Sequence, residues 1–246
     1  MKRYTQILLI AALLLAISVI VYAIQWEVFH DGRTALFYLL QDLAFLPIQI
    51  LLVAIILERI LARQERMRLL HKMNMVIGTF FSEVGVQLLG RLTPCIANRG
   101  LLADSLAIKT DWSAADWKRS IERAERFDFK VDTALADLPA LHSLLAGKGH
   151  LLTLLLSNPN LLEHERFTDL LWAVSHLAEE LAARGSFDNL PATDLAHLGG
   201  DIRRVYSHLT MQWLLYCRHL QTAYPYIYSI MVRTHPMQAN PSAIVK

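Results

Sequence analysis

The sequence predicts an all-α fold: an N-terminal two-helix transmembrane hairpin followed by a cytoplasmic antiparallel helical bundle. Two long apolar stretches lie near the N-terminus, and beyond them apolar residues recur at steps of three or four. We find no alternating strand pattern of useful length. Of the 246 residues, 54% are hydrophobic and only 19% are charged, which is less charge than the roughly 25% of soluble domains. Membrane segments joined to a soluble remainder explain that balance.

The chain divides into four predicted parts. They are the transmembrane hairpin at 1–58, a helical stalk at 59–92 continuous with the second span, the cytoplasmic bundle at 93–234 and a frayed tail at 235–246. The spans cover about 7–24 and 35–57. The first span has no charged residue and is just long enough to cross a hydrocarbon core of about 30 Å. A cleaved signal peptide is the alternative for it, although its apolar region is longer than usual for one.

Basic residues predict the orientation of the two spans. Lys2 and Arg3 precede the first span, and the segment Glu58–Lys72 after the second carries five Lys and Arg against two Glu. Such residues flank the cytoplasmic ends of membrane helices. We therefore expect a multi-pass protein of the cell inner membrane, with the N-terminus and the C-terminal domain in the cytoplasm and the short link at 25–34 outside.

The second span contains polar residues that lipid does not favour. An ionisable group within lipid costs roughly 2.5–3.5 kcal/mol on insertion scales, so it usually faces protein or water. Asp42 lies about 10 Å into the span, at a depth similar to that of Ser18 on the neighbouring helix. The residues that we single out for helix packing or a pore are Ser18, Tyr22, Gln41, Asp42, Pro47 and Gln49.

Three interpretations of these polar residues remain open. In the first, Gln41 and Asp42 hydrogen-bond Ser18 and Tyr22 and set the register of the hairpin. In the second, the true span begins at residue 43, so that Gln41 and Asp42 lie at the membrane interface. In the third, a polar stripe from Asp42 to Gln49 lines the pore of an oligomer.

A continuous helix is predicted from the second span to Leu92, because no breaker interrupts its apolar face. Gly78 and Gly85 lie seven residues apart on one side of it. Glycine costs about 1 kcal/mol relative to alanine inside a helix, so the pair indicates close packing of another helix or a hinge. Glu83 and Gln87 argue against a third membrane crossing here, and we expect a buried or membrane-surface helix.

Helix-start signals organise the bundle. Ser113 is a predicted N-cap with Asp116 three residues later, and Trp112 and Trp117 are a candidate hydrophobic staple. Further helices are expected at about 132–146 and 148–156, from Pro159 to shortly before Gly185, and from Pro191 to about Leu220.

The last two long helices each carry a polar stripe opposite an apolar one. The candidate metal or interface residues on these stripes are His176, Glu179, Asp194, His197, Asp201 and His208. Their types suit a metal ion, but a stripe opposite the core face usually points to solvent. His176 and Glu179 also have the reverse of the Glu-x-x-His order used in di-iron bundles. We therefore assign no metal and favour a subunit or partner interface.

The sequence contains none of the common motifs for catalysis, nucleotide binding or zinc binding. We find no phosphate-binding loop, no G-x-S-x-G and no H-E-x-x-H. The two cysteines, Cys95 and Cys217, are too few and too far apart for a disulfide scaffold or a thiolate zinc site. The net charge is only +2, and no basic, aromatic-interleaved patch indicates nucleic acid. No cofactor is predicted.

These observations predict a non-enzymatic membrane protein that associates with itself and whose cytoplasmic bundle binds a partner or signals. Its predicted partners are the lipid bilayer, further copies of the chain and a cytoplasmic protein. One alternative is an oligomeric ion channel lined by the second span. A less favoured one is a metal-dependent bundle enzyme using His176, Glu179, Asp194 and His197.

Overall fold

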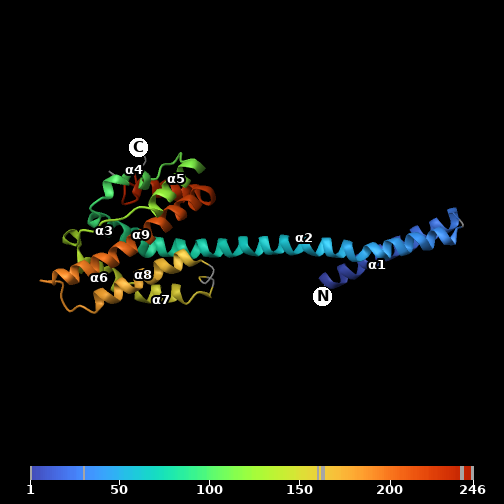
Figure 1. Ribbon diagram of the computed structural model, residues 1–246, viewed down its shortest axis with the longest axis horizontal. Helices are drawn as coiled ribbons and strands as arrows, with labels where there is room; N and C mark the ends of the chain where they lie inside the picture. The colour runs from blue at the N-terminus through green and yellow to red at the C-terminus, as the bar shows by residue number, and fades with distance from the viewer. Residues whose placement is uncertain (1, 30, 160, 162–163, 239–240, 245–246) are drawn as a thin grey trace. The chain divides into compact units, whose positions relative to one another are not determined.

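The computed structural model describes all residues except 1, 30, 160, 162–163, 239–240 and 245–246 (Figure 1). Its regular secondary structure is helical throughout the described residues, apart from one isolated bridge between Ile96 and Val131. The prediction of an all-α fold is therefore confirmed. The chain forms two compact units, a hairpin unit (Met1–Arg66) and a helical domain (Met67–Lys246), which we describe separately.

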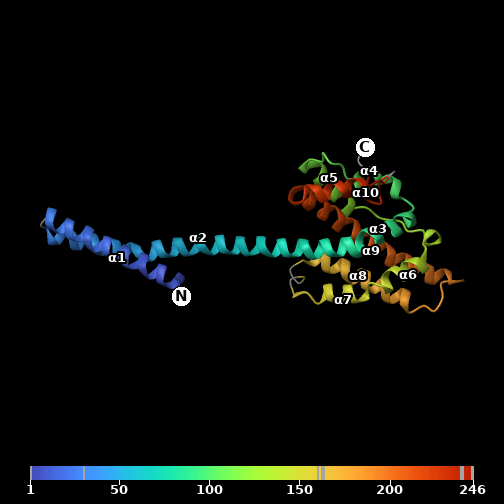
Figure 2. The same cartoon turned by 180° about the vertical axis from the view of Figure 1, so that it is seen from behind.

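The hairpin unit consists of α1 (Lys2–Phe29) and the first part of α2 (Gly32–Phe80). In both views α1 turns back alongside α2 (Figures 1 and 2). Asp31 begins the second helix, because its carboxylate accepts hydrogen bonds from the backbone amide of Arg33 at 3.0 Å and the hydroxyl of Thr34 at 2.6 Å. The short link therefore starts α2 with an ordinary acidic cap.

The helical domain begins within α2 and is arranged around α9. Its further helices are η1 (Phe81–Gly85), α3 (Val86–Leu92), η2 (Thr93–Cys95), η3 (Arg99–Leu101), α4 (Ala103–Leu106), α5 (Ala114–Glu125), η4 (Thr133–Leu135), α6 (Leu138–Ala146), α7 (Gly149–Leu156), α8 (Glu165–Ala182), α9 (Ala192–Ala223) and α10 (Pro225–Thr234). Helix α9 packs against α3, α5, α8 and α10, and α8 also contacts α6 and α7.

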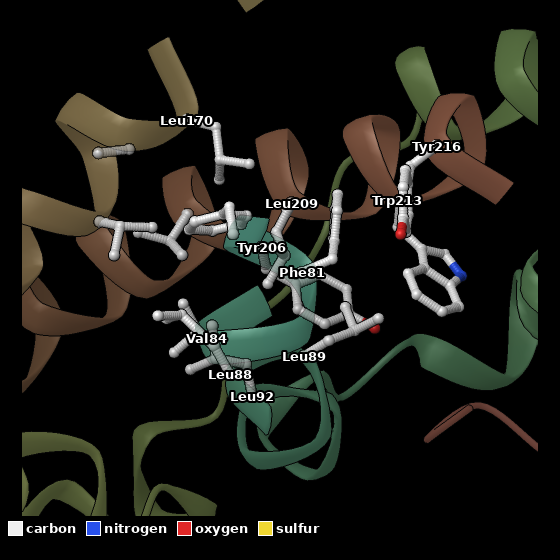
Figure 3. Close-up of a cluster of buried hydrophobic side chains, with 14 of the residues drawn as sticks. Phe81, Val84, Leu88, Leu89, Leu92, Leu170, Tyr206, Leu209, Trp213 and Tyr216 are labelled. Carbon is white, nitrogen blue, oxygen red and sulfur yellow. The ribbon is translucent and has the colours of Figure 1, made fainter. Parts of the chain in front are cut away.

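An aromatic cluster joins η1 to α9 in the core (Figure 3). Phe81 stacks on Tyr216 with ring centroids 4.9 Å apart and meets the edge of Trp213 at 5.6 Å. Phe80 packs against Phe167 of α8 at 5.5 Å. Residues at the end of the predicted stalk therefore form part of the hydrophobic core of the domain.

The helix predicted to run unbroken to Leu92 contains a π-helical turn, η1. Phe80 and Phe81 are consecutive, yet both are fully buried. A Cβ atom at Gly85 would lie 2.5 Å from Cδ1 of Phe81, so the Phe81 ring occupies the space that a side chain there would need. At Gly78, a Cβ atom would lie 3.4 Å from the Tyr216 hydroxyl, which shows the close approach of α9.

Most of the predicted helix starts are confirmed. Ser113 and Asp116 form the reciprocal capping box of α5, and the rings of Trp112 and Trp117 meet edge to face at 4.7 Å. The start of α9 is also confirmed, with Pro191 as its N-cap residue.

Two expectations differ from the structure, one about the start of a helix and one about the C-terminal tail. The helix expected to open at Pro159 begins only at Glu165, where the carbonyl of His164 accepts hydrogen bonds from the backbone amides of Phe167 and Thr168. In the tail that we expected to be frayed, His235 is fully buried. The backbone amide of Ser242 donates to the carbonyl of Arg233 at 2.9 Å, so part of the tail is held against α10.

Candidate functional site

Two histidine–carboxylate pairs face each other across the contact of α8 with α9. His176 and Glu180 lie four residues apart on α8, and His197 and Asp201 lie four residues apart on α9. Residues at this spacing share one face of a helix. Because each histidine lies near the carboxylate of the opposite helix, four side chains gather in one cluster, which we call the α8–α9 cluster.

The distances within the α8–α9 cluster are similar to one another. Nε2 of His176 lies 3.6 Å from Oδ1 of Asp201 and 3.8 Å from Oε1 of Glu180. Nε2 of His197 lies 3.4 Å from Oδ2 of Asp201 and 3.5 Å from Oε2 of Glu180. One ligand atom from each of His176, His197 and Asp201 lies within 4.8 Å of the other two.

Asp201 is buried, which contradicts our prediction that its stripe faces solvent. Only 2% of the residue is exposed. The pattern of apolar and polar residues did not predict this burial. Several helices pack around α9, so Asp201, next to the core residue Ile202, is enclosed by α8. Nη1 of Arg204 donates to Oδ1 of Asp201 at 2.9 Å. Among the residues that the structure describes, nothing donates a hydrogen bond to Oδ2.

Arg184, in the loop between the two helices, binds Glu180 of the cluster and one further carboxylate, Asp194. Its guanidinium donates to Oδ1 and Oδ2 of Asp194 at 2.6 and 2.9 Å and to Oε2 of Glu180 at 2.9 Å. These hydrogen bonds lower the pKa of Asp194 and that of Glu180. Asp194 is therefore engaged by Arg184 and lies outside the cluster.

The remaining sequence candidates on these helices are Glu179 and His208. Glu179 is exposed. His208 lies with Trp172 and Asp169 around a shallow surface hollow that His176 also lines, so it borders the α8–α9 cluster, and burial lowers the pKa of its imidazole. Glu180 was not among the candidate residues, because we paired His176 with Glu179, three residues further along the helix. The signal in the sequence is the spacing of four, His-x-x-x-Glu and then His-x-x-x-Asp.

The polar residues of the hairpin unit do not gather into a site. Each of Ser18, Tyr22, Gln41, Asp42, Pro47 and Gln49 is exposed. Within the part of the chain that the structure describes, no hydrogen bond joins Gln41 or Asp42 to either Ser18 or Tyr22. Pro47 lies inside α2, which continues past it.

The apolar side chains of the hairpin unit are equally exposed. Between Leu9 and Leu57 the large hydrophobic residues that the structure describes are 40–69% exposed. Two helices here are long and apolar enough to cross a membrane, by length and composition alone.

Comparison with known proteins places the chain in a family. Residues 69–233 match the family described as uncharacterized protein MJ1433, C-terminal helical domain, and residues 2–61 match MJ1433, N-terminal helical domain. The chain is 42% identical over 245 residues to uncharacterized protein MJ1433 of Methanocaldococcus jannaschii, an alignment covering 100% of this chain and 97% of that protein. No solved structure matches. The chain therefore belongs to the MJ1433 family.

Proposed function

We propose that the chain is a two-pass integral membrane protein that associates with itself and whose cytoplasmic helical domain binds a protein partner or signals. The observation that carries the proposal is the continuous exposure of the apolar residues of α1 and the first part of α2. Monomeric soluble proteins rarely expose apolar patches larger than a few hundred Å². A bilayer covers such a surface over its whole circumference.

The lengths of the two apolar segments fit a bilayer. The apolar window of α1 spans Leu9–Val28, 20 residues, or about 30 Å at 1.5 Å per residue, which is the thickness of the hydrocarbon core. In α2, Asp42 is the only charged residue between Arg33 and Glu58. The basic residues Arg59, Arg63, Arg66 and Arg68 follow and favour a cytoplasmic position for that end.

The proposal of a protein partner or a second copy rests on the surface of the helical domain. Trp172 on α8 is 61% exposed, and Leu154 on α7 is equally exposed. Leu154, Leu151 and Met75 line a shallow apolar groove between α7 and the end of α2. Trp172 lies at a separate surface hollow beside His208. Exposed apolar surface of this kind, with an exposed aromatic residue, is typical of surfaces that pack against another protein.

Membrane extraction and cysteine labelling test the anchor and its orientation. Cys95 and Cys217 are buried, so an added cysteine gives the main signal. We expect alkaline carbonate to leave the chain in the membrane pellet. A membrane-impermeant maleimide should label Glu27→Cys in intact cells, but Lys118→Cys only after permeabilisation. Both positions are exposed in the structure.

Two results would overturn this proposal. Release of the chain by carbonate would show that the hairpin does not span the bilayer. Labelling of Lys118→Cys in intact cells would place the helical domain outside. For self-association, light scattering in detergent should give a mass of at least two chains, and a strictly monomeric mass would remove that part.

A second candidate function, an oligomeric ion-conducting pore, is favoured by Asp42. This carboxylate lies within an apolar helix and forms no hydrogen bond or ion pair with any residue that the structure describes. A buried ionisable group in a membrane helix usually faces protein or water. A polar stripe shared by several copies would bring Asp42 and Gln49, seven residues apart, to one pore wall.

Planar-bilayer recordings separate a pore from simple helix packing. If the stripe lines a pore, the reconstituted protein conducts cations and Asp42→Asn changes the conductance or the cation selectivity. Glu27→Gln, which neutralises an exposed carboxylate outside the polar stripe, is the matched control. The absence of currents, or currents unchanged by Asp42→Asn, would exclude the pore while leaving the membrane anchor intact.

A further inference from the structure

We propose that the α8–α9 cluster binds a divalent cation of the late first-row transition series, Zn²⁺ in particular, through His176, His197 and Asp201. This inference goes beyond the proposed membrane function and does not depend on it. The proposal concerns binding, and it assigns no reaction to the metal.

The first argument is the spacing of the ligand atoms. In a tetrahedral zinc site with bonds of about 2.0–2.1 Å, neighbouring ligand atoms lie roughly 3.3–3.4 Å apart. The two imidazole Nε2 atoms lie 3.4 and 3.6 Å from the carboxylate oxygens of Asp201. These distances exceed those of ordinary N–H···O hydrogen bonds, about 2.7–3.2 Å. The two imidazoles face different oxygens of Asp201, and one ligand atom from each of the three residues lies within 4.8 Å of the other two. An inward rotation of these side chains would therefore bring the three ligand atoms to the corners of a coordination tetrahedron.

The second argument is the buried oxygen Oδ2 of Asp201. A buried carboxylate oxygen without a partner is costly, because the group has lost its hydration without replacement. Arg204 binds only Oδ1. Oδ2 points toward Nε2 of His197 at 3.4 Å, and a cation bound between these two atoms would remove the cost.

The third argument is the local charge. Asp201 and Glu180 in the cluster and Asp194 beside it supply three carboxylates, and Arg184 and Arg204 supply two guanidinium groups. One negative charge is therefore left over, which favours a cation. Arg204 donates a hydrogen bond to Asp201, and Arg184 donates to Glu180 and Asp194. Groups around a metal site commonly hydrogen-bond its ligands in this way. Glu180, held by Arg184, borders both imidazoles and lies beside the three ligands.

The fourth argument is the rigidity of the two helices. Leu177 and Leu181 on α8 and Leu198 on α9 are fully buried beside the cluster. Ligands that project from packed helices are held in place before a metal binds, so little order has to be created on binding. The donor set of two imidazoles and one carboxylate suits zinc and its neighbours better than magnesium or calcium, which prefer oxygen ligands.

The test is metal titration of the full chain in detergent, purified without a histidine tag and treated with chelator. We expect one equivalent of Co²⁺ to bind with the visible absorption of a tetrahedral site, and Zn²⁺ to displace it. His176→Ala and His197→Ala should each weaken binding by about 100-fold or more, because each removes a ligand. Glu180→Gln should weaken it by about 10-fold, as changes beside a metal site usually do.

Matched variants keep the test decisive. His150→Ala removes an exposed histidine elsewhere, and Glu179→Gln removes the exposed neighbour of Glu180; neither should change the affinity. His176 and His197 are 44% and 54% exposed at their side chains, so their variants should keep native circular dichroism. The proposal is overturned if the native chain binds no stoichiometric metal. It is equally overturned if a folded His197→Ala protein binds as tightly as the native chain.

Discussion

The hairpin unit and the helical domain are both rich in large apolar residues, but only the helical domain buries those side chains against one another. In the helical domain, leucine and phenylalanine side chains from distant helices bury one another, as Phe81, Trp213 and Tyr216 do. In the hairpin unit, the apolar residues surround each helix on all sides and remain exposed. One unit buries its apolar residues within itself, and for the other we propose that lipid covers them.

This difference shows in the pattern of polar residues as well. In the helical domain, apolar positions repeat with the helical period, so each helix has a core face and a polar face. In the hairpin unit the apolar residues show no such preference for one side, which is the pattern of a helix enclosed by apolar surroundings. The comparison predicts that equivalent substitutions in the two units have unequal effects.

The largest expected difference is between two phenylalanines. Phe81 is fully buried, whereas Phe45 is 48% exposed. Phe81→Ala should lower the free energy of unfolding of the helical domain by about 3–5 kcal/mol, because it leaves a cavity in the core. Phe45→Ala should change it by less than about 0.5 kcal/mol. Urea unfolding in detergent, followed by near-ultraviolet circular dichroism, measures both. Equal losses would contradict the separation into two units.

A pH effect should also be confined to the helical domain. Burial lowers the pKa of His235 to about 4, while the unfolded chain has a histidine pKa near 6.5. Between these values the unfolded state binds more protons, so stability is complete above about pH 6.5 and falls as the pH drops toward 4. The expected loss is on the order of 2–3 kcal/mol.

Substitution of His235 isolates its contribution. His235→Phe keeps an aromatic ring near Trp213, whose ring centroid lies 6.1 Å away, and it should flatten the acid side of the stability profile. His150→Ala, at an exposed histidine, is the control and should leave the profile unchanged. A profile that keeps its full acid slope in His235→Phe would refute this explanation.

The smallest expected effect concerns two helix caps. Ser113 caps α5 in the helical domain, and Asp31 caps α2 in the hairpin unit. Ser113→Ala should cost the helical domain about 1 kcal/mol, and Asp31→Ala should leave its unfolding unchanged. The same urea titrations measure both variants. A loss in Asp31→Ala comparable to that in Ser113→Ala would show that the two units unfold together.

Local signals in the sequence predicted much of the fold. The period of apolar residues predicted an apolar stripe on the helix that is α9, and Leu198 and Ile202 on that stripe are fully buried. The chemistry of Ser113 and Asp116 predicted the start of α5 to the residue. These features depend on neighbours within one or two helical turns, which is why a single sequence reveals them.

Features that depend on the packing of distant segments were missed. The π-helical turn at η1 arises because Phe80 and Phe81 both enter the core formed by α8 and α9. The burial of Asp201 and the role of Glu180 require the register between α8 and α9, which no local pattern contains. The predicted roles of the polar residues around Asp42 depend on neighbours beyond the chain itself and remain predictions.

The central claim, that lipid surrounds the hairpin, is tested most directly by a spin label at Leu51→Cys in reconstituted vesicles. Leu51 is 60% exposed near the middle of the apolar part of α2. Apolar oxygen concentrates in lipid, whereas a polar nickel chelate stays in water. We predict that oxygen relaxes the label strongly and that the chelate has little effect. Strong relaxation by the chelate, or access by neither reagent, would contradict the claim by placing Leu51 in water or inside a protein interface.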